Sequence, residues 1–155
     1  MVDMQRSSGI LMPVFSLPSP YGIGTLGQAA RTFVDFLKAA GQTWWQILPV
    51  GPTGYGDSPY QSFSTYAGNP YFVDLDLLVR DGLLKKEEIE ARDWGRDPSR
   101  VDYAAIYRSR FQLLQIAASY LTSAFITIFD GILPSPDQLG MRLALLVLAI
   151  ILTGI

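Results

Sequence analysis

Apolar residues near the N-terminus form two short runs separated by one helical stripe. The run GILMPVFSL (9–17) is short, apolar and bounded by glycine and proline, which predicts a buried β-strand. The run TWWQILPV (43–50) starts with β-branched and aromatic residues and predicts a second strand. Between them, apolar side chains recur at intervals of four and three, the spacing of one helix face. These positions are Leu26, Ala30, Phe33, Leu37 and Ala40.

Local signals set the expected ends of this helix. Thr25 followed three residues later by Gln28 has the spacing of a capping box, so we expect Thr25 to be the N-cap. Gly41 is the expected first residue beyond the C-cap. A strand, a helix and a strand joined by short connections predict a parallel pair with a right-handed crossover, and therefore an α/β fold.

Two further helices are expected downstream of a long loop. DLDLLVRDG (74–82) predicts a short helix capped by Asp74 or Asp76 and closed by Gly82. Asp102 is the expected N-cap of a longer helix whose apolar stripe repeats every three or four residues. The stripe consists of Tyr103, Tyr107, Phe111, Leu114, Ala118 and Leu121.

Charge divides the chain near residue 118. Residues 1–118 hold 23 of the 26 charged side chains, whereas 22 of the 37 residues in 119–155 are apolar or aromatic. We therefore divide the sequence into 1–118 and an apolar tail, 119–155. The end of the tail, 139–155, is an apolar run in which the Arg142 side chain could snorkel to a membrane interface. This run is shorter than the ~20 residues of a membrane-spanning helix.

Composition removes several kinds of chemistry. With no cysteine and no histidine, the chain cannot form disulfides, Ser-His-Asp or Cys-His machinery, or the usual imidazole metal sites. Its formal net charge of −2 gives no indication of nucleic-acid binding. The N-terminus lacks the features of a signal peptide, so we expect a cytoplasmic protein.

The connection after the second predicted strand, GPTGYGDSPYQSFSTYAGNPYF (51–72), combines six aromatic rings with four glycines and three prolines. Ligands of parallel α/β folds meet the loops at the carboxyl ends of strands, and this loop is unusually long. Its tyrosines could lie against the C–H faces of sugar rings, with Asn69 among the polar groups that could bind their hydroxyls. These tyrosines are Tyr55, Tyr60, Tyr66 and Tyr71. The alternative is an Ω-like loop whose rings pack inward, with Asp57 closing an Asx turn.

A family resemblance favours the first alternative. GPTGYGDSPYQSFSTYAGNPYFVDLDLL closely resembles the N-terminal signature of the 4-α-glucanotransferases called amylomaltase or disproportionating enzyme. GILMPVFSLPSPYGIGTLG, FVDFLKAAGQTWWQILPVGP and VDYAAIYRSRF resemble the same family in the same order, from about residue 6 to 118. The resemblance implies the N-terminal portion of an elaborated (β/α)₈ TIM barrel.

The resemblance also implies an activity, a substrate and site residues. Family members transfer α-1,4-glucan segments between maltooligosaccharides by a retaining mechanism, which needs neither a metal nor an organic cofactor. Four residues of this loop match contacts to sugar near the cleavage point: Asp57, Ser58, Tyr60 and Gln61. Tyr55 and Tyr107 match aromatics of a secondary glucan site. Because Tyr107 also lies on the apolar stripe, we expect its ring in the core instead.

The chain departs from the family in two respects. The family's catalytic carboxylates lie beyond the segment represented here, and ~250 residues are needed to close such a barrel. We therefore assign no catalytic residue and expect an incomplete barrel without turnover of its own. The alternative function is a non-catalytic glucan-binding or membrane-tethered module.

Residues 119–155 do not resemble the family. Three interpretations of this tail stay open: a frameshifted or chimeric gene end, a membrane-associating helix over 139–155, or a helix buried against a partner. The abrupt loss of family character at residue 118 favours the first.

Overall fold

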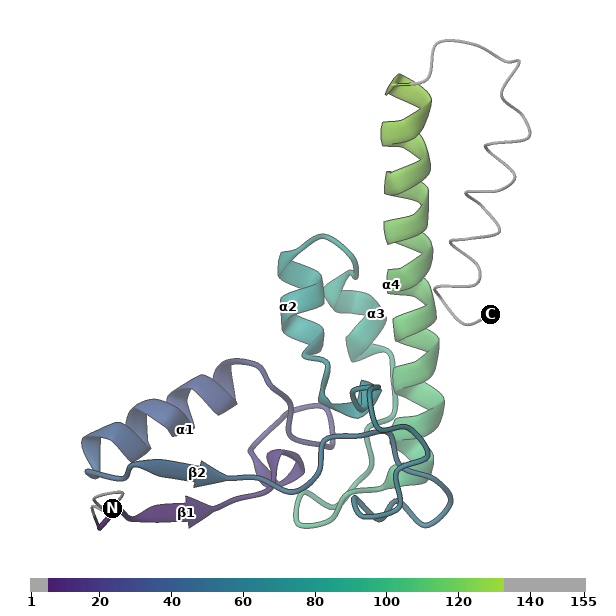
Figure 1. Ribbon diagram of the computed structural model, residues 1–155. Helices are drawn as coiled ribbons and strands as arrows, with labels where there is room; N and C mark the ends of the chain where they lie inside the picture. Colours follow the sequence, from purple (N-terminus) through teal and green to yellow (C-terminus); the bar gives the residue numbers. More distant parts are fainter. Residues whose placement is uncertain (1–5, 133–155) are drawn as a thin grey trace.

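A computed structural model describes residues 6–132 of the chain, and their side chains through Ser123. A long helix stands beside two short helices, and a small sheet with one helix lies to their side (Figure 1). The elements, in chain order, are β1 (Gly9–Leu11), the 3₁₀ turn η1 (Val14–Ser16), α1 (Gln28–Ala39), β2 (Trp44–Gln46), the 3₁₀ turn η2 (Pro70–Phe72), α2 (Leu75–Arg80), α3 (Lys86–Glu90) and α4 (Tyr103–Ile132).

The two strands pair in parallel, as predicted, but both are only three residues long. Gly9 lies opposite Trp44, and Leu11 lies opposite Gln46. β1 ends early because Pro13 leads the chain into η1. The prediction that this strand is buried is wrong, since all three of its residues are exposed.

One face of the sheet packs on α1. The Trp45 and Phe33 ring centroids lie 5.2 Å apart, and Ala30 and Leu37 of the predicted stripe are buried. Leu26 and Ala40, at the ends of the stripe, are exposed. Within residues 6–132, α1 is the only helix of the fold seen against the sheet in Figure 1.

The C-terminal end of α1 follows prediction and its N-terminal end does not. Gly41 has φ +69°, and Gln42 N donates to Leu37 O at 2.9 Å, which completes a left-handed cap. At the other end Gly27 is the N-cap and no side chain caps the helix. The Thr25 hydroxyl donates instead to the Asp74 carboxylate at 2.6 Å, so the predicted capping box is wrong.

α2 and α4 begin as predicted. Leu77 N donates to Asp74 Oδ1 at 3.0 Å, and Ala105 N donates to Asp102 Oδ1 at 3.0 Å. Gly82 closes α2 with φ +75°, and Leu83 N donates to Leu78 O at 2.8 Å. Each of these signals acts through a hydrogen bond within five residues of its helix end.

The buried face of α4 differs from the predicted stripe. The buried residues between 103 and 123 are Ala105, Ile106, Ser109, Arg110, Leu113 and Ala117. Tyr107 is 58% exposed and Leu121 is 57% exposed, so the expected core position of Tyr107 is wrong. The reason is that the β1–α1 connection packs on Ile106, while residues of α2 and α3 share the second apolar cluster with Leu113 and Ala117.

Two apolar clusters join the N-terminal loop to the helices. The first contains Val14, Leu17, Ile23, Ala30, Tyr71, Phe72 and Ile106. The second contains Tyr21, Leu75, Leu84, Ile89, Leu113 and Ala117. The core thus lies between the β1–α1 connection, the end of the 51–72 loop and the first half of α4.

The predicted division at residue 118 falls inside α4, which continues to Ile132. The expectation of a membrane helix over 139–155 lies outside the described residues. Among those that are described, no helix combines the length and apolar character needed to cross a bilayer.

Candidate functional site

The aromatic loop, residues 51–72, is closed at its base by its own backbone. Asn69 N donates to Val50 O at 2.8 Å, and Thr53 forms an isolated antiparallel bridge with Ser62. Gly51 lies so close to Ser62 that an added Cβ would collide with its hydroxyl. The two ends of the loop therefore lie side by side.

Two turns shape the tip of the aromatic loop. Asp57 N donates to Gly54 O at 3.1 Å, and Gln61 N donates to Ser58 O at 3.0 Å. Asp57 has φ +54°, a left-handed conformation that Asp tolerates better than most residues. Within residues 6–132 it is the one non-glycine residue with a positive φ.

Four of the six rings of the aromatic loop are exposed to solvent, and two are buried. Tyr55 and Tyr66 are fully exposed, and Tyr60 and Phe63 are about three-quarters exposed (73% and 76%). Tyr71 and Phe72 are buried in the first apolar cluster. The Ω-loop alternative thus describes only the last two rings, and the expectation that Tyr71 faces a sugar is wrong.

The end of the aromatic loop is fixed by capping. Asn69 is buried, and its Oδ1 accepts from Tyr71 N at 2.9 Å to cap η2. This amide was expected among the sugar-binding groups, and that expectation is wrong because the cap occupies it. Of the other predicted contacts, Gln61 is exposed, while Asp57 and Ser58 are half-buried.

The first turns of α4 bring Tyr107 to the aromatic loop. The Tyr71 ring packs on Tyr103 at 5.9 Å and on Phe111 at 6.0 Å between centroids, and Tyr107 packs on Phe111 at 4.7 Å. Asp57 lies close enough for its charge to act on Tyr71 and Tyr103. The structure therefore brings Asp57 and Tyr107 near one buried tyrosine, Tyr71.

A cavity of about 10 Å³ lies beneath the aromatic loop, with Thr53, Asp57 and Tyr103 among its lining residues. The Thr53 hydroxyl is buried, and no group in the described part of the chain forms a hydrogen bond with it. A cavity needs roughly 10–15 Å³ to hold one water molecule, so a single water fits the size of the space and the polarity of its wall.

Burial, reinforced by the charge of Asp57, raises the pKa of Tyr71 from 10.0 to about 12. Between these pH values the unfolded chain loses this proton while the folded chain keeps it, so folding stability falls as pH rises. We expect Tyr71→Phe to remove this loss, which amounts to roughly 2 kcal/mol between pH 9 and pH 12. Urea unfolding at the two pH values measures it.

Two comparisons make the Tyr71→Phe measurement specific. Burial lowers the pKa of Arg110 to about 10, so the titration of Arg110 makes folding stability rise with pH over the same range. This contribution is the same in the unsubstituted chain and in Tyr71→Phe. Tyr120→Phe, on the exposed surface of α4, is the matched control. An equal change of pH dependence in both variants would contradict the assignment to Tyr71.

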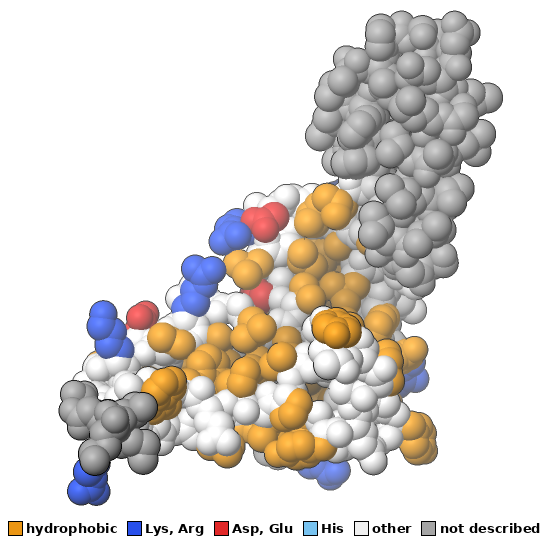
Figure 2. All heavy atoms as spheres, viewed as in Figure 1, with side chains coloured by type: hydrophobic (Ala, Val, Ile, Leu, Met, Phe, Trp, Pro, Cys, Tyr) orange, Lys and Arg blue, Asp and Glu red, His pale blue; other side chains and the backbone are white. Residues whose placement is uncertain are grey.

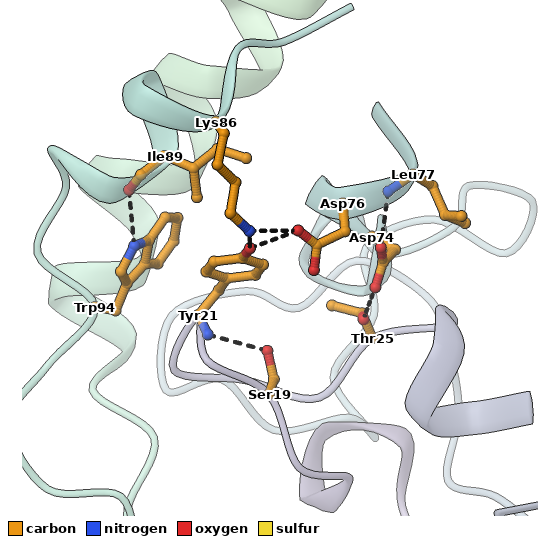
Figure 3. A network of polar contacts seen from close by, with 9 residues as sticks. All are labelled: Ser19, Tyr21, Thr25, Asp74, Asp76, Leu77, Lys86, Ile89 and Trp94. Carbon is orange, nitrogen blue, oxygen red and sulfur yellow. Dashed lines mark hydrogen bonds and ion pairs between the residues drawn. The ribbon is translucent and has the colours of Figure 1, made fainter. Parts of the chain in front are cut away.

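A polar network joins the N-terminal loop to α2 and α3 (Figure 3). The Tyr21 hydroxyl donates to Asp76 Oδ1 at 2.6 Å, and Lys86 Nζ donates to both the Tyr21 hydroxyl and Asp76 Oδ1. Burial acts to raise the pKa of Asp76, but the hydrogen bonds from Lys86 and Tyr21 outweigh it and hold that pKa below its usual value. Trp94 covers the Tyr21 ring at 5.5 Å.

The sequence did not indicate this network. Tyr21, Asp76 and Lys86 are separated by up to 65 positions, and no local spacing pairs them. Asp76 was expected only as an alternative cap of α2.

Arg110 is a buried cation that ties α4 to the end of the aromatic loop. Its side chain is 0% exposed, and Nη1 donates to Val73 O at 2.6 Å. The guanidinium carbon lies 5.8 Å from the centre of the Trp94 ring, and among the described residues Nε and Nη2 have no hydrogen-bond partner. Sequence reasoning missed this position because an arginine on a helix is usually solvated.

The described part of the chain has no group of three or more acidic residues placed to hold a metal ion. Around the exposed rings of the aromatic loop, the polar side chains are hydroxyl, amide and carboxylate groups.

Comparison with known proteins gives one consistent result. The family model described as 4-alpha-glucanotransferase matches residues 12–127. A 4-alpha-glucanotransferase of Streptococcus pneumoniae is 58% identical over 113 residues, which are 73% of this chain and 22% of that protein. One from Thermus thermophilus is 49% identical over 116 residues, 75% of this chain and 22% of that protein.

A solved structure agrees with the sequence comparisons. The amylomaltase from Streptococcus agalactiae, in complex with acarbose, is 42% identical with a TM-score of 0.71 over 81% of this chain and 27% of its own. This neighbour supports the predicted relationship to TIM-barrel enzymes. The chain spans about a fifth of the length of the curated relatives that it matches.

Proposed function

This chain belongs to the 4-alpha-glucanotransferase family, and from that premise we propose that its aromatic loop binds α-1,4-glucans for the transfer reaction. The observation that carries the proposal is the exposure of the Tyr55 and Tyr60 rings on a loop whose ends are fixed. An aromatic ring without a ligand exposes apolar area to water, which a sugar face would cover.

The geometry of the aromatic loop suits a sugar chain. Tyr60 lies between Ser58 and Gln61 at one turn, so a ring face and two polar side chains belong to the same four-residue segment. Aromatic faces bind the C–H side of glucose, and the neighbouring hydroxyl and amide groups can bind its edge. Asp57, the last residue of the preceding turn, supplies a carboxylate acceptor next to Ser58.

We propose that the described residues bind substrate and do not break its glycosidic bond. A retaining mechanism needs two carboxyl groups about 5 Å apart, one as nucleophile and one as acid and base. The family resemblance assigns neither role to a residue of this chain. β1 and β2 are then the first strands of the barrel, and residues 1–118 are its N-terminal portion.

The membrane-tethered alternative depends on residues 139–155, which lie outside the described part of the chain. Nothing in residues 6–132 favours it over glucan binding. The cytoplasmic location and the separate nature of residues 119–155 stay predictions.

Titration with maltoheptaose tests the proposal. We expect saturable binding by the full chain, and we expect Tyr55→Ala and Tyr60→Ala each to weaken it about fivefold, since one ring contributes about 1 kcal/mol. Tyr66→Ala is the matched control, because Tyr66 is equally exposed but matches no sugar contact of the family. Isothermal titration calorimetry supplies the affinities.

Two outcomes would count against the proposal. One is the absence of saturable binding in a sample whose circular dichroism shows folded helices. The other is an equal loss from Tyr66→Ala, or equal affinity for the β-1,4-linked cellohexaose, which would indicate nonspecific contact with exposed rings.

A further inference from the structure

The tip of the aromatic loop lies at the surface, while its underside closes a small cavity. Figure 2 shows hydrophobic side chains at the surface of the lower right of the molecule, where the aromatic loop lies in Figure 1. The cavity of about 10 Å³ lies beneath the loop, and proline, isoleucine and aromatic side chains form most of its wall. Three polar side chains without a ring also line it: Thr53, Asp57 and Asn69. An unpaired hydrogen-bonding group is especially costly in such an enclosed, largely apolar space.

The Thr53 hydroxyl is the unpaired group of this wall. Its oxygen is buried, and no group within residues 6–132 forms a hydrogen bond with it. Asn69, by contrast, accepts a hydrogen bond from Tyr71 N through its Oδ1. The bridge between Thr53 and Ser62 fixes the backbone at this position, so the residue stays at the cavity. A buried hydroxyl without a partner is unfavourable, which predicts a partner inside the cavity.

A water molecule fits this role by size and by chemistry. The volume of the cavity is that of roughly one water, and an enclosed water takes about two to four polar partners. The Thr53 hydroxyl is one such partner, and Asp57 lies in the same wall. Burial, and then the charge of Asp57, raises the pKa of both Tyr71 and Tyr103, which also line the cavity, so the carboxylate lies near it. One water can donate to the carboxylate and still accept from the hydroxyl.

Asp57 has a backbone conformation that its surroundings must hold. Its φ is +54°, and a non-glycine residue keeps a left-handed conformation only where neighbouring contacts favour it. The hydrogen bond from Asp57 N to Gly54 O supplies one such contact. The next residue, Ser58, begins the turn that carries Tyr60 and ends at Gln61. The conformation of Asp57 therefore sets the direction in which that turn leaves.

We propose that Thr53 is a positioning residue of the glucan site, and that one enclosed water links its hydroxyl to the carboxylate of Asp57. The link holds Asp57 in its left-handed conformation and so fixes the turn over residues 58–61. The inference rests on the proposed function for the role of that turn in binding. Thr53 acts through Asp57 and does not touch the glucan. A loop that is fixed before binding loses less conformational entropy when the ligand arrives, so the link strengthens binding.

Urea unfolding of the full chain tests the water link without any ligand. Thr53→Val replaces the hydroxyl by a methyl group of similar size. We expect it to raise the unfolding equilibrium constant about fivefold, because the water and Asp57 lose a hydrogen-bonded partner. A dry cavity predicts the opposite sign, since valine would then remove an unpaired hydroxyl. Thr65→Val is the matched control on the exposed surface of the same loop, with an expected change of less than about twofold.

A double-mutant cycle tests whether the link ends at Asp57. Asp57→Gly removes the carboxylate and tolerates the left-handed backbone. In that background we expect Thr53→Val to change the unfolding equilibrium constant by less than about twofold, because the two partners of one water act as a unit.

Binding of maltoheptaose tests the positioning role. We expect Thr53→Val to weaken binding about threefold and Thr53→Ser, which keeps the hydroxyl, to keep the affinity of the unsubstituted chain. If Thr53 mattered only through packing, the order would be reversed, because valine keeps the shape of threonine and serine does not. Isothermal titration calorimetry measures all three proteins.

The outcomes separate this inference from the glucan-binding proposal. The water link is overturned if Thr53→Val unfolds no more readily than the unsubstituted chain, if Thr65→Val has an equal effect, or if the effects of Thr53→Val and Asp57→Gly are additive. Unchanged maltoheptaose affinity in Thr53→Val would overturn the positioning role. An unsubstituted chain that does not bind maltoheptaose would contradict the proposed function, while the unfolding test of the water link would remain valid.

Discussion

Gly24→Ala is expected to destabilise the chain by about 3 kcal/mol or more, at the upper end of the effects of overpacking. A Cβ at this position would collide with Val14 O and would lie 2.7 Å from Leu17 O and 2.8 Å from Leu17 N. These are backbone atoms of and beside η1, so no side-chain rotation relieves the contact. Gly24 N also donates to Phe15 O at 3.1 Å, which fixes its position.

Gly68→Ala is the control for this substitution. No atom lies within 4 Å of its added Cβ, and its φ is not in the left-handed region. We expect its free energy of unfolding to change by no more than about 0.5 kcal/mol. Urea unfolding followed by circular dichroism measures both variants, and a loss below 1 kcal/mol for Gly24→Ala would show that η1 can move away at little cost.

Ile106→Ala is expected to lower the free energy of unfolding by about 3 kcal/mol, within the range for a large aliphatic residue truncated in a core. Ile106 is 0% exposed and contributes to the first apolar cluster, where it lies close to Gly22. Its removal leaves a cavity between α4 and the N-terminal loop. Thermal and urea unfolding should both report the loss.

The adjacent residue supplies the control for Ile106→Ala. Tyr107 is larger but 58% exposed, so Tyr107→Ala should cost less than about 1.5 kcal/mol, including its contact with Phe111. A larger loss of stability from Tyr107→Ala than from Ile106→Ala would contradict the burial of Ile106 in place of Tyr107. It would favour the apolar stripe predicted from the sequence.

The sequence predicted the local features of the fold well. Asp74 and Asp102 cap their helices, and Gly41 closes α1 through bonds within five residues. Thr25 was mispredicted because a carboxylate 49 positions away accepts its hydroxyl. Capping is a local preference, and a tertiary hydrogen bond of comparable strength can replace it.

Burial on α4 could not be predicted from apolar periodicity alone. The stripe through Tyr103, Tyr107 and Phe111 is regular, yet the helix buries Ser109 and Arg110 instead of Tyr107. Ser109 donates to Asp93 O at 2.7 Å, and Arg110 donates to Val73 O. Polar side chains become core residues here because carbonyl groups from distant segments accept their hydrogen bonds.

The sequence predicted which segment forms the candidate site but not which of its rings are exposed. The ring-rich composition and the family resemblance both indicated residues 51–72. Neither could tell that Tyr71 packs inward while Tyr55 and Tyr60 stay exposed, because that division depends on contacts with Tyr103 and Phe111.

The two carboxylates of α2 have a consequence for the order in which the molecule can assemble during synthesis. Asp74 and Asp76 accept hydrogen bonds from Thr25 and Tyr21, and Lys86 completes the second pair. A ribosome must therefore translate past codon 86 before the segment that follows β1 acquires these partners. Until then the Thr25 and Tyr21 hydroxyls lack the partners that hold the β1–α1 connection against α2 and α3.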